Sequence, residues 1–231
     1  MVDYRPSLAG TTSALQKAAS RMPLWLEFSL IIGLCVGQAF LHSAQTLFVD
    51  ARTVTRVLTD QAAAVNALLD MLAVALTLGL LKARGWKLSD LLPIKPAWSG
   101  LFAGLALLAA YRVISIVVYI VLSGINGGPL AAINYGNQLT PLGAIASSVD
   151  AAFIEELITL GYVLHVLKDK GAFYAITAST FIRLAVHLSQ GPVELAVVVP
   201  MGILFGILYW RNRNLWPLLV AHGLFTLITL V

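Results

Sequence analysis

Residues 141–168 read PLGAIASSVDAAFIEELITLGYVLHVLK, an apolar stretch long enough to cross a membrane as a helix. Two adjacent carboxylates, Glu155 and Glu156, interrupt it near its middle. Carboxylates are costly in hydrocarbon, so inside a membrane they face a polar cavity or a charged partner. The stretch therefore predicts a membrane-spanning helix, and its glutamate pair is the first place to look for chemistry.

The whole chain shares this apolar character. Its 231 residues are 59% hydrophobic and only 11% charged, with a mean hydropathy of +0.86. Such a composition excludes a soluble domain and indicates a polytopic membrane protein. Seven stretches are of spanning length: residues 23–42, 62–81, 98–123, 141–167, 172–189, 192–210 and 215–231. We predict an all-α transmembrane helical bundle of about seven spans over residues 23–231, preceded by a cytoplasmic segment, 1–22, in which residues 7–21 suit a surface helix.

Basic residues give this bundle an orientation. Of the 15 Lys and Arg residues, eleven lie in the N-terminal segment and in the connectors that follow an even number of spans, which share its side of the membrane, and only Arg52 and Arg56 lie in the opposite loops. Because cytoplasmic loops are rich in Lys and Arg, this predicts a cytoplasmic N-terminus and a C-terminus on the far side. We expect an integral protein of a bacterial inner membrane, and we assign the basic excess to orientation rather than to a nucleic-acid partner.

Several ionisable side chains lie inside the predicted spans, and they are mixed in sign. They are Asp70, Arg112, Asp150, Glu155, Glu156, Arg183, His187 and His222. Two arginines against four carboxylates indicate internal pairing. For Asp70, Arg112 and Asp150 we expect structural ion pairs that lock helices together.

The glutamates and histidines favour a functional interpretation. A carboxylate and a histidine within reach of one water molecule can deprotonate it, and a second histidine can donate to the oxyanion that forms when that water attacks a carbonyl. Glu155, His187 and His222 lie on the fourth, fifth and seventh stretches, so this chemistry requires those helices to converge on one cavity.

Other interpretations of the histidines stay open. Single histidines in membrane helices also serve as hydrogen-bond partners between helices, or as axial ligands of a tetrapyrrole. A zinc site is less supported, because the chain has no His-Glu-x-x-His pair and no cysteine cluster. We therefore predict no metal and no cofactor.

Three motifs in the last two fifths of the chain resemble those of a known family. Residues 154–162, IEELITLGY, resemble the Glu-Glu-x-x-x-Arg-Gly motif of the CPBP family, which includes CAAX prenyl proteases and bacteriocin-processing (Abi) intramembrane proteins. Residues 183–187, RLAVH, fall where the family has Phe-x-x-x-His. Residues 202–206, GILFG, and 214–217, NLWP, lead into 222–226, HGLFT, where the family has His-x-x-x-Asn. The resemblance covers about residues 140–231.

This resemblance implies an all-helical core like that of type II CAAX endopeptidases. Carried over by position, Glu155 and His187 would activate water, and His222 and Thr226 would face the oxyanion. Glu156 would be the structural carboxylate that pairs with the motif arginine.

Three positions depart from the family pattern. Leu160 replaces the motif arginine, Arg183 replaces an aromatic residue, and Thr226 replaces the asparagine. Positions 156 and 160 share a helix face, as do 183 and 187. We therefore hypothesise that Arg183 supplies, from a neighbouring helix, the positive charge that Leu160 lacks. A guanidinium so close to Glu155 would weaken that carboxylate as a base.

Two functions follow from these observations. The first is an intramembrane endopeptidase that hydrolyses a peptide bond in a lipidated or hydrophobic peptide. The alternative is a catalytically degenerate member that serves as a scaffold, assembly or immunity-type subunit of a membrane complex. Membrane lipid is a partner in both cases.

Small residues recur at helical spacing on three stretches. Gly33 with Gly37, Gly100 with Gly104, and Gly202 with Gly206 each form G-x-x-x-G, which permits close approach of two helices. We expect tight packing inside the bundle at these positions rather than an oligomer interface.

Overall fold

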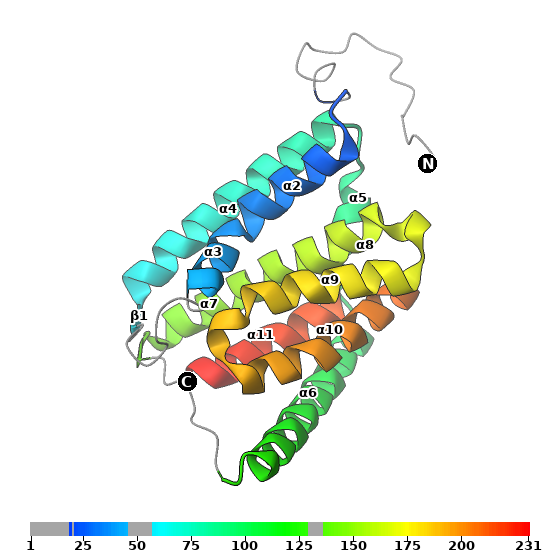
Figure 1. The fold of residues 1–231 in the computed structure, drawn as a ribbon. Helices are drawn as coiled ribbons and strands as arrows, with labels where there is room; N and C mark the ends of the chain where they lie inside the picture. The colour runs from blue at the N-terminus through cyan, green and yellow to red at the C-terminus, as the bar shows by residue number, and fades with distance from the viewer. Residues whose placement is uncertain (1–18, 20, 46–56, 129–135) are drawn as a thin grey trace.

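The computed structural model describes residues 19, 21–45, 57–128 and 136–231. All seven apolar stretches are helical in it (Figure 1). The long helices are α4 (Asp60–Ala83), α6 (Trp98–Ile125) and α10 (Pro192–Asn212). The shorter ones are α2 (Leu24–Cys35), α3 (Gly37–Gln45), α5 (Leu88–Leu91), α9 (Ala172–Val186) and α11 (Trp216–Leu230). The surface helix expected over residues 7–21 lies, apart from residues 19 and 21, outside the described residues.

The fourth stretch is a continuous helix that changes character next to the glutamate pair. It consists of α7 (Pro141–Glu156), a π-helical turn, η2 (Leu157–Tyr162), and α8 (Val163–Val166). Thr140 caps its N-terminus by accepting a hydrogen bond from the Gly143 amide at 3.2 Å, and proline suits the first helical position. All six residues of η2 are buried. π turns inside α-helices often mark functional sites, and this one begins directly after Glu156.

The all-α membrane bundle is confirmed, whereas its helices account for fewer spans by length than the seven predicted. Among the described residues, three helices, α4, α6 and α10, are long and apolar enough to cross a membrane. The pair α2 and α3 meets the same test together but bends by 67° between the two helices, which gives up to four single or paired helices of spanning length. α9 and α11 have 15 residues each, about 22 Å of helix against a hydrocarbon core of about 30 Å.

Four helices stand in a row, α4, α7, α11 and α6, in which each contacts the next. Figure 1 shows α4 and α6 on opposite sides of the bundle. Helix α10 packs on α9 and α6, while α2 packs on α4 and α3 packs on α9. Two three-residue strands, β1 (Val57–Thr59) and β2 (Gly136–Gln138), pair in parallel and bring the starts of α4 and α7 together. There the Thr140 amide donates to Asp60 Oδ1 at 3.0 Å.

Two of the three glycine motifs pack inside the bundle, as expected. A Cβ added at Gly100 would lie 2.6 Å from Trp216 Cδ1, and one at Gly206 would lie 2.8 Å from Ile176 Cγ2. Gly33, by contrast, has nothing within 4 Å of an added Cβ. The motifs on α6 and α10 therefore allow close contact with α11 and α9, and the motif in the first stretch does not serve this purpose.

Candidate active site

Arg183 of α9 contacts both glutamates at the end of α7. Its Nη1 and Nη2 donate to Glu156 Oε1 and Oε2 at 3.0 and 2.8 Å, which is the bidentate geometry of a strong ion pair. The same Nη1 lies 2.7 Å from Glu155 Oε1. Glu156 is fully buried, and Arg183 is only 6% exposed. The structure thus brings together the residues of the hypothesised charge pair, and it places the guanidinium on Glu155 as well.

Besides the two glutamates, a threonine of the π turn also binds this guanidinium. Arg183 Nη2 donates to Thr159 Oγ1 at 2.8 Å, and the Thr159 hydroxyl in turn donates to the Glu155 carbonyl at 2.8 Å. The Thr159 carbonyl accepts from Ser179 Oγ at 2.6 Å, which ties η2 to α9. Sequence reasoning missed Thr159, because a single threonine in an apolar helix carries no pattern of its own. Leu160 is fully buried in the apolar core.

His187 lies at the C-terminal end of α9 rather than within a continuing helix. It is the C-cap residue and leads into a 3-10 turn, η4 (Leu188–Gln190). Its Nδ1 contacts Gln190 Oε1 at 2.6 Å, and its Nε2 lies 3.4 Å from Glu155 Oε1. An imidazolium would donate to both oxygens, whereas a neutral ring would donate to only one of them.

His222 of α11 completes the cluster from a fourth side. Its Nδ1 lies 2.7 Å from Glu156 Oε1, and its Nε2 lies 3.8 Å from Glu155 Oε2. The three helices required by the hydrolytic interpretation therefore do converge. His222 makes its shorter contact with Glu156, the carboxylate to which the family resemblance assigns a structural role.

A small cavity lies among these side chains. It measures about 20 Å³, enough for one water molecule. Its lining residues are Tyr111, Glu155, Arg183, His187, Val198, Met201, Phe205 and His222. Thr226, expected at the oxyanion, does not line it. Tyr111 belongs to α6, far from the motifs in the sequence, so sequence reasoning had no signal for it.

Glu194 adds a third carboxylate that sequence reasoning also missed. It lies in the first turn of α10 and interacts electrostatically with His187, Glu155 and His222. An acidic residue near the start of a predicted span was the available signal. Among the described residues, no group of three His, Cys, Asp or Glu side chains is arranged to hold a metal ion.

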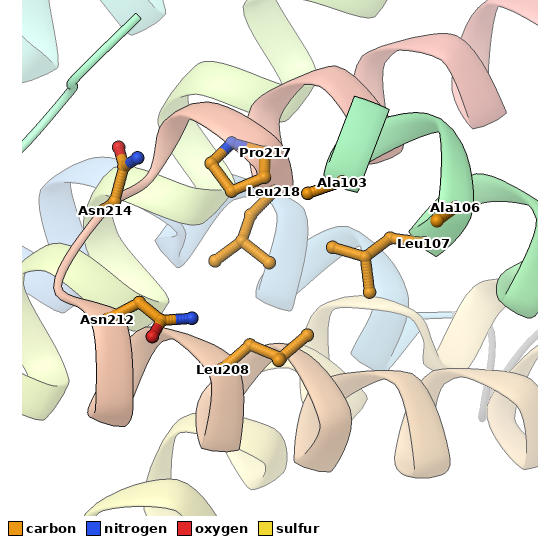
Figure 2. A pocket seen from close by; sticks show the side chains of 8 residues that line it. All are labelled: Ala103, Ala106, Leu107, Leu208, Asn212, Asn214, Pro217 and Leu218. Atoms are coloured by element: carbon orange, nitrogen blue, oxygen red, sulfur yellow. The ribbon is translucent and has the colours of Figure 1, made fainter. Parts of the chain in front are cut away.

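A larger apolar pocket lies among α6, α10 and α11, three of the helices that also line the small cavity (Figure 2). It measures about 280 Å³ and is lined by Ala103, Ala106, Leu107, Leu208, Asn212, Asn214, Pro217 and Leu218. Figure 2 shows the Asn212 amide at one end, pointing into the pocket. Leu107 and Leu218 precede Tyr111 and His222 by one helical turn, so the pocket lies beside the small cavity.

The ion pairs expected for Asp70, Arg112 and Asp150 were wrong. Asp70 of α4 and Asp150 of α7 are hydrogen-bonded to each other. The guanidinium carbon of Arg112 lies 4.7 Å from the centre of the Phe225 ring, a cation–π contact. The physical reason is distance across the bundle, because α7 and α11 stand between α4 and α6.

A second buried ionic cluster, centred on Glu27, escaped the sequence analysis. Glu27 of α2 is fully buried and pairs with Arg84, and it also accepts a hydrogen bond from the Tyr162 hydroxyl at 2.9 Å. Arg84 further donates to the Ala19 and Met22 carbonyls. The cluster joins α2 and the end of α4 to the π turn. The sequence feature that could have revealed this cluster is Glu27 itself, a single acidic residue inside the first apolar stretch.

Comparison with known proteins finds a family match that covers the cluster around Glu155 and Glu156. Residues 137–228 match the family described as type II CAAX prenyl endopeptidase Rce1-like. The chain carries an Rce1-like domain. The matched region contains both glutamates, Arg183 and both histidines of the site, and it confirms the family resemblance seen in the motifs. The chain matches no curated protein and no solved structure.

The Rce1-like domain does not contain the whole site. Tyr111, which lines the small cavity, lies before residue 137, and so does Glu27 of the second ionic cluster. The apolar helices and the Rce1-like domain together identify an integral membrane protein.

Proposed function

We propose that this chain is a non-catalytic member of its family, in which Arg183 locks the two glutamates of the Rce1-like domain into a structural ion-pair network. The observation that carries the proposal is the 2.7 Å contact between Arg183 Nη1 and Glu155 Oε1. A general base must offer a lone pair to the water that it deprotonates. The oxygen of Glu155 nearest His187 is already bound to a guanidinium.

The surroundings of Glu155 support the same conclusion. Its Oε1 is shared between Arg183 and His187, while its Oε2 faces His222 at 3.8 Å. Thr226 does not line the cavity, so the oxyanion donor expected at that position is missing there. Removal of one such donor typically costs about 100- to 1000-fold in rate.

The role that remains is assembly. We propose a scaffold, assembly or immunity-type subunit of a membrane protein complex, in a bacterial inner membrane. We further propose that the N-terminus is cytoplasmic and the C-terminus lies on the far side, because eleven basic residues lie on one side against two on the other. Labelling of single cysteines added at each end, with a membrane-impermeant reagent on sealed vesicles, tests this orientation.

Hydrolysis of a lipidated or hydrophobic peptide is the second candidate function. It is favoured by the water-sized cavity beside Glu155 and His187, and by the adjacent apolar pocket of about 280 Å³, which suits a hydrocarbon chain. In this case Glu155 and His187 would activate the water, and His222 would donate to the oxyanion.

A proteolysis assay separates the two functions. The full-length protein in liposomes would be given a quenched fluorescent peptide that carries a farnesylated cysteine. We expect no more cleavage by the wild type than by Glu155→Gln or by the exposed acid-to-amide control Asp169→Asn. Wild-type cleavage that Glu155→Gln alone abolishes, with folding intact, would overturn the proposal.

A restored motif shows whether the peptide can be a substrate at all. The triple variant Leu160→Arg, Arg183→Phe, Thr226→Asn returns the family pattern at the three departures. We expect this variant to gain cleavage over the wild type, because it frees Glu155 and supplies an amide donor.

A further inference from the structure

Arg112, in the middle of α6, has no partner of opposite charge in the part of the chain that the structure describes. Among the residues that the structure describes, it forms no ion pair, and its guanidinium carbon lies 4.7 Å from the centre of the Phe225 ring. That ring is itself stacked on Tyr111 at 3.7 Å, so it holds the guanidinium on a fixed aromatic surface. A guanidinium inside a membrane normally pairs with a carboxylate or with backbone carbonyls.

Arg112 lies far from both ends of α6, so its guanidinium does not readily reach water. It follows Trp98, an interfacial type of residue at the start of α6, by 14 residues, or about 21 Å of helix. The apolar helix then continues for 13 more residues to Ile125. Its neighbours Val113 and Ile116 are 60% and 57% exposed, so this part of α6 faces outward from the bundle. No described residue of this copy supplies an anion for Arg112, so we look for one on a neighbouring molecule.

The opposite side of the bundle carries a pair of carboxyls that no described basic residue contacts. The carboxyls of Asp70 and Asp150 are hydrogen-bonded to each other across the contact between α4 and α7. Each lies ten residues beyond the Thr140–Asp60 hydrogen bond that joins the starts of these two helices, and both side chains are half-buried. Among the described residues, no Lys, Arg or His pairs with either of them. A hydrogen bond between two carboxyls requires a proton on one, and the other is free to carry a single negative charge that matches one guanidinium.

The two groups lie at corresponding positions along their helices. Asp70 precedes Arg84, at the end of α4, by 14 residues, and Arg112 follows Trp98, at the start of α6, by 14 residues. Each distance is about 21 Å along its helix, measured from ends that the short segment 84–97 joins on one side of the bundle. The outermost helices of the row, α4 and α6, lie on opposite sides of the bundle (Figure 1), and they carry groups of opposite charge.

We propose that Arg112 of one copy binds the Asp70–Asp150 seam of a second copy, so that copies associate side by side in the membrane through α6 and α4. Copies in one membrane share a single orientation, so a group near the middle of α6 in one copy can meet a group near the middle of α4 in the next. The contact joins two different surfaces, and it therefore propagates into a row or closes into a ring rather than stopping at a dimer. It does not depend on whether Glu155 takes part in hydrolysis.

Mixing two variants tests this arrangement directly. Arg112→Gln removes the basic surface but keeps the acidic one, and Asp70→Asn with Asp150→Asn does the reverse. Full-length protein labelled with donor or acceptor dye would be reconstituted in liposomes, and association would be measured by energy transfer over a range of protein-to-lipid ratios. Circular dichroism and thermal unfolding would confirm that each variant is folded, and Lys170→Gln is the matched exposed control.

We expect the wild type and Lys170→Gln to associate, and each variant alone to associate roughly tenfold more weakly. An equimolar mixture of the two variants should recover association, limited to pairs, because one intact contact can form between them. A monomeric wild type would overturn the proposal, and is the result expected if Arg112 binds an acidic helix of another protein. Undiminished association of either variant alone would also overturn it. So would a mixture of the two variants that associates no more strongly than each variant alone.

Discussion

Replacement of Arg183 by leucine is the sharpest test of the ion-pair network. The change removes a guanidinium that is bonded to Glu156 through both nitrogens, to Thr159 and to Glu155, at distances of 2.7 to 3.0 Å. Breaking a buried pair by removing one partner typically costs about 3–5 kcal/mol, because the other charge is left uncompensated. Here two carboxylates are left, so we expect a loss toward the upper end of that range.

The second half of the experiment removes one stranded charge. In Arg183→Leu with Glu156→Gln, the buried carboxylate of Glu156 becomes a neutral amide that can still bond His222. We expect the double variant to be more stable than Arg183→Leu alone by about 2 kcal/mol, so that the two single losses are strongly non-additive. The free energy of unfolding would be measured by denaturing the protein with SDS in mixed micelles.

A control pair separates this coupling from general destabilisation. Asp169 is exposed in the turn that follows α8. In Arg183→Leu with Asp169→Asn, the losses of unfolding free energy should add within about 0.5 kcal/mol. If the losses of Arg183→Leu and Glu156→Gln add equally well, the two residues do not act as a pair, and the explanation for Leu160 is refuted.

Two further stability predictions follow from close contacts. Gly104→Ala should lose about 1–3 kcal/mol of unfolding free energy, because the added Cβ would lie 2.8 Å from a backbone carbonyl of α11. Gly33→Ala is the control and should lose nothing, because nothing lies within 4 Å of its added Cβ. Equal effects of the two variants would contradict this packing. Tyr162→Phe should lose about 1–3 kcal/mol in the same assay, because Glu27 is fully buried and loses a hydrogen bond. The half-exposed Tyr174→Phe is its control and should be neutral.

The helical character of the chain and the core of its site were predictable from sequence for one physical reason. Hydrocarbon offers no hydrogen bonds, so the few charged groups inside it must find one another. That constraint, together with the leucine at position 160 in place of the motif arginine, predicted from sequence the ion pair between Arg183 and Glu156. The same reasoning made the convergence of His187 and His222 a condition of the hydrolytic hypothesis.

The failures share a cause as well. Charge sign alone suggested ion pairs among Asp70, Arg112 and Asp150, but sign carries no information on which side of a bundle a helix lies. Arg84 was interpreted only as a topological signal, although one arginine can orient a loop and also pair with Glu27. The 67° bend between α2 and α3 could not be foreseen, because a hydropathy window reports how apolar a segment is and not where it turns.

The aromatic stack of Tyr111 on Phe225 has a consequence for how this protein can be divided. It seals the charged cluster with a side chain from α6, whereas detectable similarity to relatives begins only at residue 137. A graft of residues 137–228 into another scaffold would carry the acids, the arginine and the histidines but leave them open on one flank. Chimaeras should therefore be joined ahead of α6, since the part of the chain that packs around the site is longer than the matched region.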